Sequence, residues 1–97
     1  MRIIARKTLI DYRNKKPESE MALKSWYAEA SHAQWKTPAE IKEQFKSASI
    51  LKKNHVVFNI CGNKFRLIVK INYEFALIYI RFIGTYAEYD AVDAEEI

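Results

Sequence analysis

The sequence predicts an α+β fold in which two to three helices come first and an antiparallel sheet follows. Apolar residues recur at helical spacing over the first half of the chain and alternate at strand spacing after residue 54. The 97 residues contain no repeat and no low-complexity linker, and 49% of them are hydrophobic. We therefore expect one domain spanning residues 1–97, with a packed core.

The N-terminal half is expected to hold one short strand and the helices. RIIA at 2–5 is apolar and fits a short first strand, and residues 6–16 are rich in helix formers. Between Pro17 and about Ala30, apolar residues recur at positions i, i+3, i+4 and i+7, which predicts an amphipathic helix. TPAE at 37–40 is a capping-box signature with proline at the first helical position, so a further short helix should begin there.

The C-terminal half is expected to form a curved antiparallel meander of three main strands, with the N-terminal strand added to it. The strands are VVFNIC (56–61), KFRLIVKIN (64–72) and FALIYIRFIG (75–84). Gly62-Asn63 is a two-residue hairpin signal, and Tyr73-Glu74 is taken as the second turn.

These two turns predict which residues face each other. The first pairs apolar residues on one face, such as Phe58 with Leu67, and the second places Arg66 opposite Arg81 on the other face. Like charges opposite one another on a sheet cost roughly 0.2–1 kcal/mol. We interpret the pair as a phosphate site, because a guanidinium grips phosphate oxygens with a planar fork of donors. The competing interpretation is that cations merely solvate an open sheet face. The same face should carry His55, Lys70 and Tyr79.

Charge is distributed unevenly along the chain. Residues 85–97 hold five acids and no Lys or Arg, so all 16 cations lie in residues 1–84 with only seven of the 12 acids. A body this basic is often built to meet a polyanion. The acidic tail at about 85–97 is interpreted as a solubilising segment, and the alternative is that it lies over the basic groove.

Several classes of protein are disfavoured. The single cysteine, Cys61, excludes an internal disulfide, and one Cys with two His is too few for a structural zinc site. No apolar run approaches the ~20 residues of a membrane span. The N-terminus lacks the apolar stretch of a secretory signal, so we expect a cytoplasmic protein.

VVFNICGNKFRLIVKINY, followed by YIRFIGTYAEYD, resembles the HigB toxins of bacterial type II toxin–antitoxin systems, within the RelE-like superfamily of messenger-RNA endoribonucleases. RIIA, KSWY, WKTPAEIK and SASIL extend the resemblance through nearly the whole chain. The resemblance implies helices packed on a curved sheet and cleavage of mRNA on translating ribosomes without a metal or other cofactor. It also implies inhibition by a HigA antitoxin with a helix-turn-helix domain, through which the pair would bind operator DNA.

The implied chemistry is attack of the RNA 2′-hydroxyl on the adjacent phosphate. Charge on the phosphate would be stabilised by Arg66 and Arg81. Proton transfer would come from His55, Tyr86, Tyr89 or a lysine whose pKa is depressed by cationic neighbours. RNA would be held by Lys52, Lys53, Lys64, Lys70 and Tyr79.

The family pattern usually reads GTHAEYDK where this chain reads GTYAEYDA, so Tyr86 and Ala91 replace the usual histidine and lysine. This departure motivates a second hypothesis, a catalytically attenuated homologue that acts as an antitoxin-binding and operator-regulating module. A third hypothesis is a plain nucleic-acid-binding protein that acts through charge alone.

Overall fold

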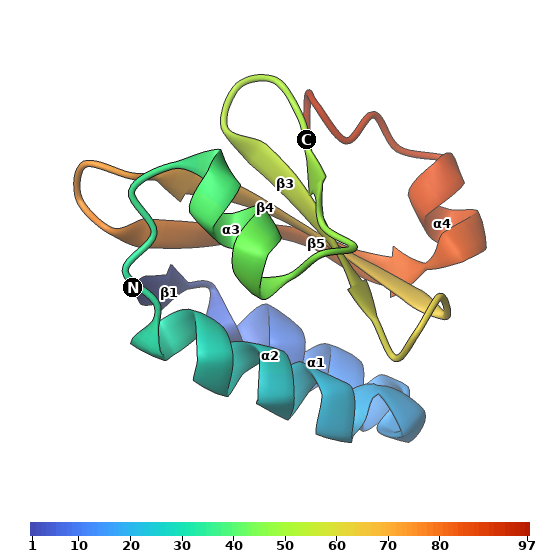
Figure 1. Ribbon diagram of the computed structural model, residues 1–97. Helices are drawn as coiled ribbons and strands as arrows, with labels where there is room; N and C mark the ends of the chain where they lie inside the picture. The colour runs from blue at the N-terminus through green and yellow to red at the C-terminus, as the bar shows by residue number, and fades with distance from the viewer.

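A five-stranded sheet lies at the centre of the computed structural model, which describes residues 1–97 (Figure 1). The strand order is β1-β5-β4-β3-β2. The strands are β1 (Arg2–Ile4), β2 (Ser49–Ile50), β3 (His55–Ile60), β4 (Phe65–Asn72) and β5 (Leu77–Thr85). The helices are α1 (Arg6–Lys15), α2 (Glu20–His32), α3 (Pro38–Gln44) and α4 (Tyr86–Asp90), with a 3₁₀ turn at Pro17–Ser19 before α2. The predicted α+β class, with helices first and strands later, is confirmed.

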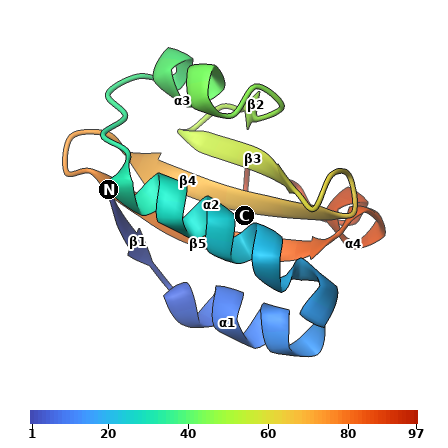
Figure 2. The same ribbon diagram turned by 60° about the horizontal axis from the view of Figure 1, so that its bottom comes forward.

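The apolar core lies between one face of the sheet and the helices. In Figures 1 and 2, α1 and α2 lie together on one side of the sheet, and α4 with the chain end lies on the other. Phe58 is at the centre of an aromatic cluster, with its ring centroid 5.3 Å from that of Trp26 and 5.1 Å from that of Phe45. Trp26 and Trp35 are each 3% exposed, so both tryptophans are core residues. None of the helices has the length and apolar composition needed to cross a membrane.

Two local expectations, the capping box at residues 37–40 and the short first strand, are confirmed. The capping box at Thr37 is present: Glu40 N–H donates to Thr37 Oγ1, and the Glu40 carboxylate accepts from Thr37 N–H. The short N-terminal strand β1 exists, but it runs parallel to β5, so the sheet is mixed. The two-residue strand β2, which pairs with β3, was not predicted.

The predicted register of β3 and β4 is confirmed. Phe58 lies opposite Leu67, Asn59 opposite Arg66, and His55 opposite Lys70. The turn is centred where expected: Gly62 has φ +65°, and Lys64 N–H donates to Cys61 O at 3.3 Å. Because residues alternate between faces, this register fixes which side chains of β3 and β4 face away from the helices.

The predicted register of β4 and β5 is wrong. The turn spans Tyr73 to Ala76 rather than two residues, and a β-bulge interrupts the pairing near Arg81. Asn72 shapes the turn by accepting a hydrogen bond from Phe75 N–H, at 3.0 Å, while Ala76 adopts φ +55°. As a result Arg66 lies opposite Gly84, so the predicted Arg66–Arg81 pair does not form.

A further short helix, α4, begins inside the acidic tail. Thr85 forms its capping box with Glu88, and Glu88 N–H donates to Thr85 Oγ1 at 3.2 Å. A Cβ on Gly84, just before the cap, would lie 2.6 Å from the tip of the Phe82 ring, so this ring would have to shift to admit a side chain. After β5 the chain forms α4 and stays on the side of the sheet opposite α1 and α2 (Figures 1 and 2).

Candidate functional site

The face of the sheet turned away from α1 and α2, which we call the polar face, carries most of the residues singled out in the sequence. One cross-strand row consists of His55 on β3, Lys70 on β4 and Tyr79 on β5. Beside this row is an open depression of about 620 Å³. It is lined by Asn54, Lys70, Ile71, Asn72, Tyr73, Glu74, Tyr79 and Arg81. The structure thus brings Lys70, Tyr79 and Arg81 together, but Arg66, the other half of the predicted phosphate site, does not line this depression.

Arg81 lies at the bulge of β5 with an exposed side chain. Its Nε and Nη2 atoms both donate to the backbone oxygen of Ile97, at 2.9 Å and 2.7 Å. Both donors share a single oxygen atom here, and the same two N–H groups could instead bind two oxygens of a phosphate. Arg81 is therefore an exposed group with donors suited to an anion, and Ile97 is its acceptor in this structure.

Arg66 occupies a different environment. Its side chain is buried, and its Nη1 donates to the carbonyl oxygens of Asn63 and Phe65, at 3.1 Å and 3.3 Å. The guanidinium carbon lies 4.7 Å from the ring centroid of Tyr86, a cation–π contact. Tyr86 is half exposed, and its ring is 6.4 Å from that of Tyr89. Arg66, Tyr86 and Tyr89 thus form a second cluster, at the base of α4.

His55 is buried, which differs from the surface position usual for a histidine at a strand start. Its Nδ1 lies 3.0 Å from the carbonyl oxygen of Lys53 and 3.3 Å from that of Lys52. Carbonyl oxygens only accept, so Nδ1 carries a proton. Nε2 is buried without a partner and, in the neutral ring, is a free acceptor. Such an atom has the hydrogen-bonding capacity that a general base requires.

The lysines differ in their partners. Lys53 Nζ pairs with Glu96 at 2.6 Å, and Lys64 Nζ pairs with Glu18 at 3.0 Å. Hydrogen bonds to these carboxylates raise the pKa of both lysines above the ordinary 10.5. The expectation of a lysine with a depressed pKa is therefore wrong for Lys53 and Lys64. Lys52 and Lys70 are exposed and make no side-chain ion pair.

Two features of this region were missed in the sequence. The T-x-x-E pattern at 85–88 is the same capping signature recognised at 37–40, and it would have predicted α4. Asn54 and Asn72 line the depression because the turns that contain or flank them end beside it. No short sequence pattern predicts that these two side chains lie next to Lys70 and Arg81.

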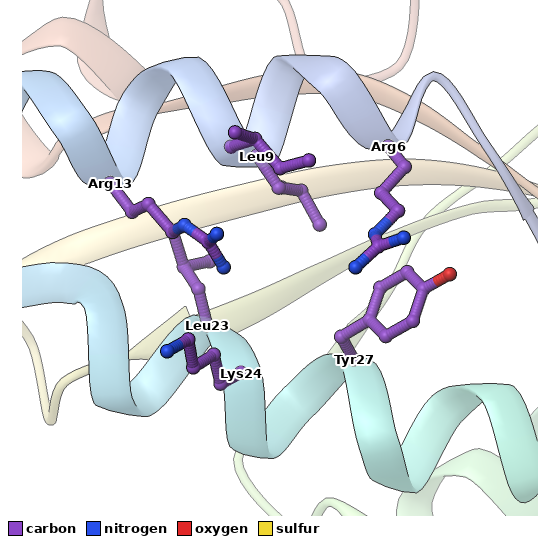
Figure 3. A pocket seen from close by; sticks show the side chains of 7 residues that line it. Arg6, Leu9, Arg13, Leu23, Lys24 and Tyr27 are labelled. Carbon is purple, nitrogen blue, oxygen red and sulfur yellow. The ribbon is translucent and has the colours of Figure 1, made fainter.

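A second, smaller recess of about 80 Å³ lies between α1 and α2, on the opposite side of the sheet (Figure 3). Leu9 and Leu23 form part of its apolar lining, and the Arg6 guanidinium lies 5.0 Å from the Tyr27 ring centroid. Arg13 lines the recess from α1. These arginines are remote from the polar face and supply controls for substitutions there.

Most of the chain is similar to one family of known proteins. Residues 19–92 match the family model described as HigB_toxin, RelE-like toxic component of a toxin-antitoxin system. The chain is 32% identical over 92 residues to the mRNA interferase toxin HigB of Escherichia coli (strain K12), covering 93% of this chain and 88% of that protein. The mRNA interferase HigB of Shigella flexneri gives the same identity and coverage. The mRNA interferase HigB of Escherichia coli O6:H1 (strain CFT073) is 28% identical, covering 93% of this chain and 89% of that protein.

Proposed function

The chain belongs to the HigB family of RelE-like toxins and is an mRNA interferase of a toxin–antitoxin system, and from this premise we propose that it cuts mRNA on translating ribosomes in the cytoplasm, using its polar face. The observation that carries the proposal is the grouping of Lys70, Tyr79 and Arg81 around one open depression. A HigA-type antitoxin is proposed to inhibit the toxin and to carry the pair to operator DNA.

The proposed reaction needs no metal, because the nucleophile is part of the RNA. The 2′-hydroxyl loses its proton and attacks the adjacent phosphorus, and the bond to the 5′-oxygen breaks. The products are a 2′,3′-cyclic phosphate and a 5′-hydroxyl. The protein must hold the strand so that these atoms are in line, stabilise negative charge on the phosphate oxygens, and move two protons.

Arg81 is proposed to stabilise the phosphate charge, because its exposed fork already holds an oxygen acceptor. Lys70 and Tyr79 beside it, with Lys52 and Lys53, would hold the strand through phosphate contacts and stacking. His55 is proposed as the base that accepts the 2′-hydroxyl proton once RNA binding exposes its Nε2, a buried free acceptor in the row that contains Lys70 and Tyr79.

The second cluster is proposed to act on the leaving side of the phosphate. Tyr86 would donate a proton to the 5′-oxygen, with Tyr89 as the alternative donor, and Lys64 would hold a flanking phosphate. Arg66 supports this cluster by keeping its guanidinium against the Tyr86 ring, and it supplies a positive charge near the reacting group. Arg66 lies opposite Gly84 and not opposite Arg81, so the second cluster would reach the reacting phosphate from the adjoining part of the polar face.

An attenuated toxin is the second candidate function, and the phenol at position 86 favours it. Tyr86 stands where the resemblance leads us to expect histidine, and a phenol transfers protons less readily than imidazole near neutral pH. In that case the chain would still bind its antitoxin and regulate the operator.

The test is induced expression in a bacterial host that lacks the antitoxin, followed by primer extension on abundant transcripts. Wild type should arrest growth and leave cuts at defined positions in codons, and Arg81→Ala should do neither. Arg13→Ala, which removes an arginine from the α1–α2 recess, is the matched control and should behave as wild type. Soluble wild-type protein that causes neither arrest nor cuts would favour the attenuated toxin.

A further inference from the structure

The last residues of the acidic tail form an ordered segment, residues 92–97, which we call the C-terminal strap. Glu96 N–H and Ile97 N–H both donate to Asp93 O, at 3.1 Å and 3.0 Å, and Glu95 N–H donates to the Asp93 side chain at 3.1 Å. These bonds fold the strap into a compact turn. The turn fixes the positions of the Glu95 and Glu96 carboxylates and of the Ile97 backbone oxygen.

Three acceptors of the strap are bound to donors around the polar face. Glu96 pairs with Lys53, the Glu95 carboxylate accepts from Lys52 N–H at 3.3 Å, and the Ile97 backbone oxygen accepts both bonds from Arg81. Glu96 and Ile97 are neighbours in the chain, and together they bind a cation from the turn before β3 and a cation from β5, with β4 lying between these two strands.

Apolar side chains of the polar face are also buried, so a segment of the chain covers part of this face. Val57 and Ile68 lie opposite each other on the face turned away from the core, yet they are only 2% and 0% exposed. The C-terminal segment is what lies on that side of the sheet in Figures 1 and 2. His55, also on this face, is 4% exposed and keeps Nε2 without a partner. His55 is thus a buried polar side chain of the polar face with one ring nitrogen left without a partner.

We propose that the C-terminal strap is a tethered competitor of RNA, which occupies the phosphate-binding donors of Lys53 and Arg81 and is displaced when an RNA strand binds. This inference rests on the proposed function for its ligand. Carboxylates and a backbone oxygen satisfy the same cationic donors that phosphate oxygens would satisfy. The strap and an RNA phosphate cannot occupy these donors at the same time. The apparent affinity for RNA is therefore reduced by the fraction of molecules in which the strap is docked.

The test measures binding of a short single-stranded 2′-O-methyl RNA, which lacks the nucleophile and cannot be cut. The paired substitution Glu95→Gln with Glu96→Gln weakens the strap and raises the formal net charge from +4 by two. The control, Glu29→Gln with Glu43→Gln, changes the charge equally on α2 and α3. In low salt the strap variant should bind about two- to fivefold more tightly than the control, as expected for the loss of one exposed ion pair and one hydrogen bond to the backbone. The difference should shrink as salt screens the ion pair. Equal affinities would overturn the proposal.

Two further readouts separate the strap from general effects. Backbone ¹⁵N relaxation should show the amides of Glu95 and Ile97 rigid in the free protein and mobile at saturating RNA. A strap that is mobile in the free protein, or that stays rigid with RNA bound, would contradict the proposal. In a Lys53→Ala background, the strap variant should gain less affinity than in wild type, because both changes act on the same contact.

Failure of the strap is distinguishable from failure of the proposed function. Cleavage of mRNA with equal RNA affinities in the strap and control variants would refute the strap and leave the interferase intact. Tighter RNA binding by the strap variant without any cleavage would refute the interferase and leave the competition standing.

Discussion

Thr85→Ala tests whether α4 holds the reacting groups of the second cluster. The hydroxyl of Thr85 accepts from Glu88 N–H at 3.2 Å, and it caps a helix of only five residues. Loss of such a cap costs typically about 1 kcal/mol. Because α4 makes few turns and contains no buried residue, a loss of this size is enough to fray it. Tyr86 would then leave the guanidinium of Arg66.

Thr37→Ala is a matched control, because Thr37 and Glu40 form the same capping box at the start of α3. Both substitutions should destabilise their helices by about 1 kcal/mol, and for Thr37→Ala this corresponds to roughly 4–8 °C in the midpoint of thermal unfolding. Only Thr85→Ala should also lower the rate of mRNA cleavage, since only α4 carries Tyr86.

The assay combines thermal unfolding, hydrogen exchange of the α4 amides, and single-turnover cleavage on programmed ribosomes. Thr85→Ala should speed exchange in α4 and reduce cleavage, while Thr37→Ala changes the melting temperature alone. Equal losses of cleavage in both variants would mean that general instability, not the position of α4, limits the reaction. Full activity of Thr85→Ala with a frayed α4 would remove Tyr86 from the mechanism.

Three other predictions concern the scaffold. Hydrogen bonds from Thr85 lower the pKa of Glu88 below the ordinary 4.5. The carboxylate half of the capping box therefore stabilises α4 fully above pH about 4.5 and is lost as pH falls through the lowered pKa, so hydrogen exchange in α4 should quicken in acid. Gly84→Ala should destabilise by about 1–3 kcal/mol in urea unfolding, because its Cβ would meet the Phe82 ring at 2.6 Å, and an unchanged midpoint would show that this ring moves freely. Phe58→Ala should cost about 3–5 kcal/mol by removing the centre of the aromatic cluster, and a cost below 1 kcal/mol would contradict the packing described.

The first hairpin of the sheet could be predicted because its information is local. Alternation of apolar residues defined the two faces of β3 and β4, and the Gly62-Asn63 turn fixed the register that places His55 opposite Lys70. The capping box at Thr37 is equally local, and it marks the start of α3.

The second hairpin could not be predicted, because its turn carries no such signal. No glycine occurs between Tyr73 and Ala76, and the left-handed conformation falls on Ala76, a residue that rarely adopts it. The bulge near Arg81 depends on the paired strand and leaves no trace in the local pattern. The predicted register placed Arg81 opposite Arg66, and the observed register separates them. Both residues remain in the candidate site, in different clusters.

The position of the tail depends on contacts that are distant in sequence. Lys53 and Glu96 are 43 residues apart, and charge composition alone favoured a solubilising role for the tail. Only the fold shows that the acidic residues lie against the cations expected to bind RNA. The parallel pairing of β1 with β5 is likewise invisible in a strand of three residues.

The most direct test of the account is cleavage of a defined mRNA on purified, programmed ribosomes by wild type, Arg81→Ala and Arg13→Ala. We predict cuts by wild type and Arg13→Ala with a 2′,3′-cyclic phosphate at the new end, and a rate about 10²- to 10³-fold lower for Arg81→Ala, as is typical when one charge-stabilising donor is removed. Intact mRNA with soluble wild-type protein, or equal rates for the two arginine variants, would contradict the claim that the polar face carries out the reaction.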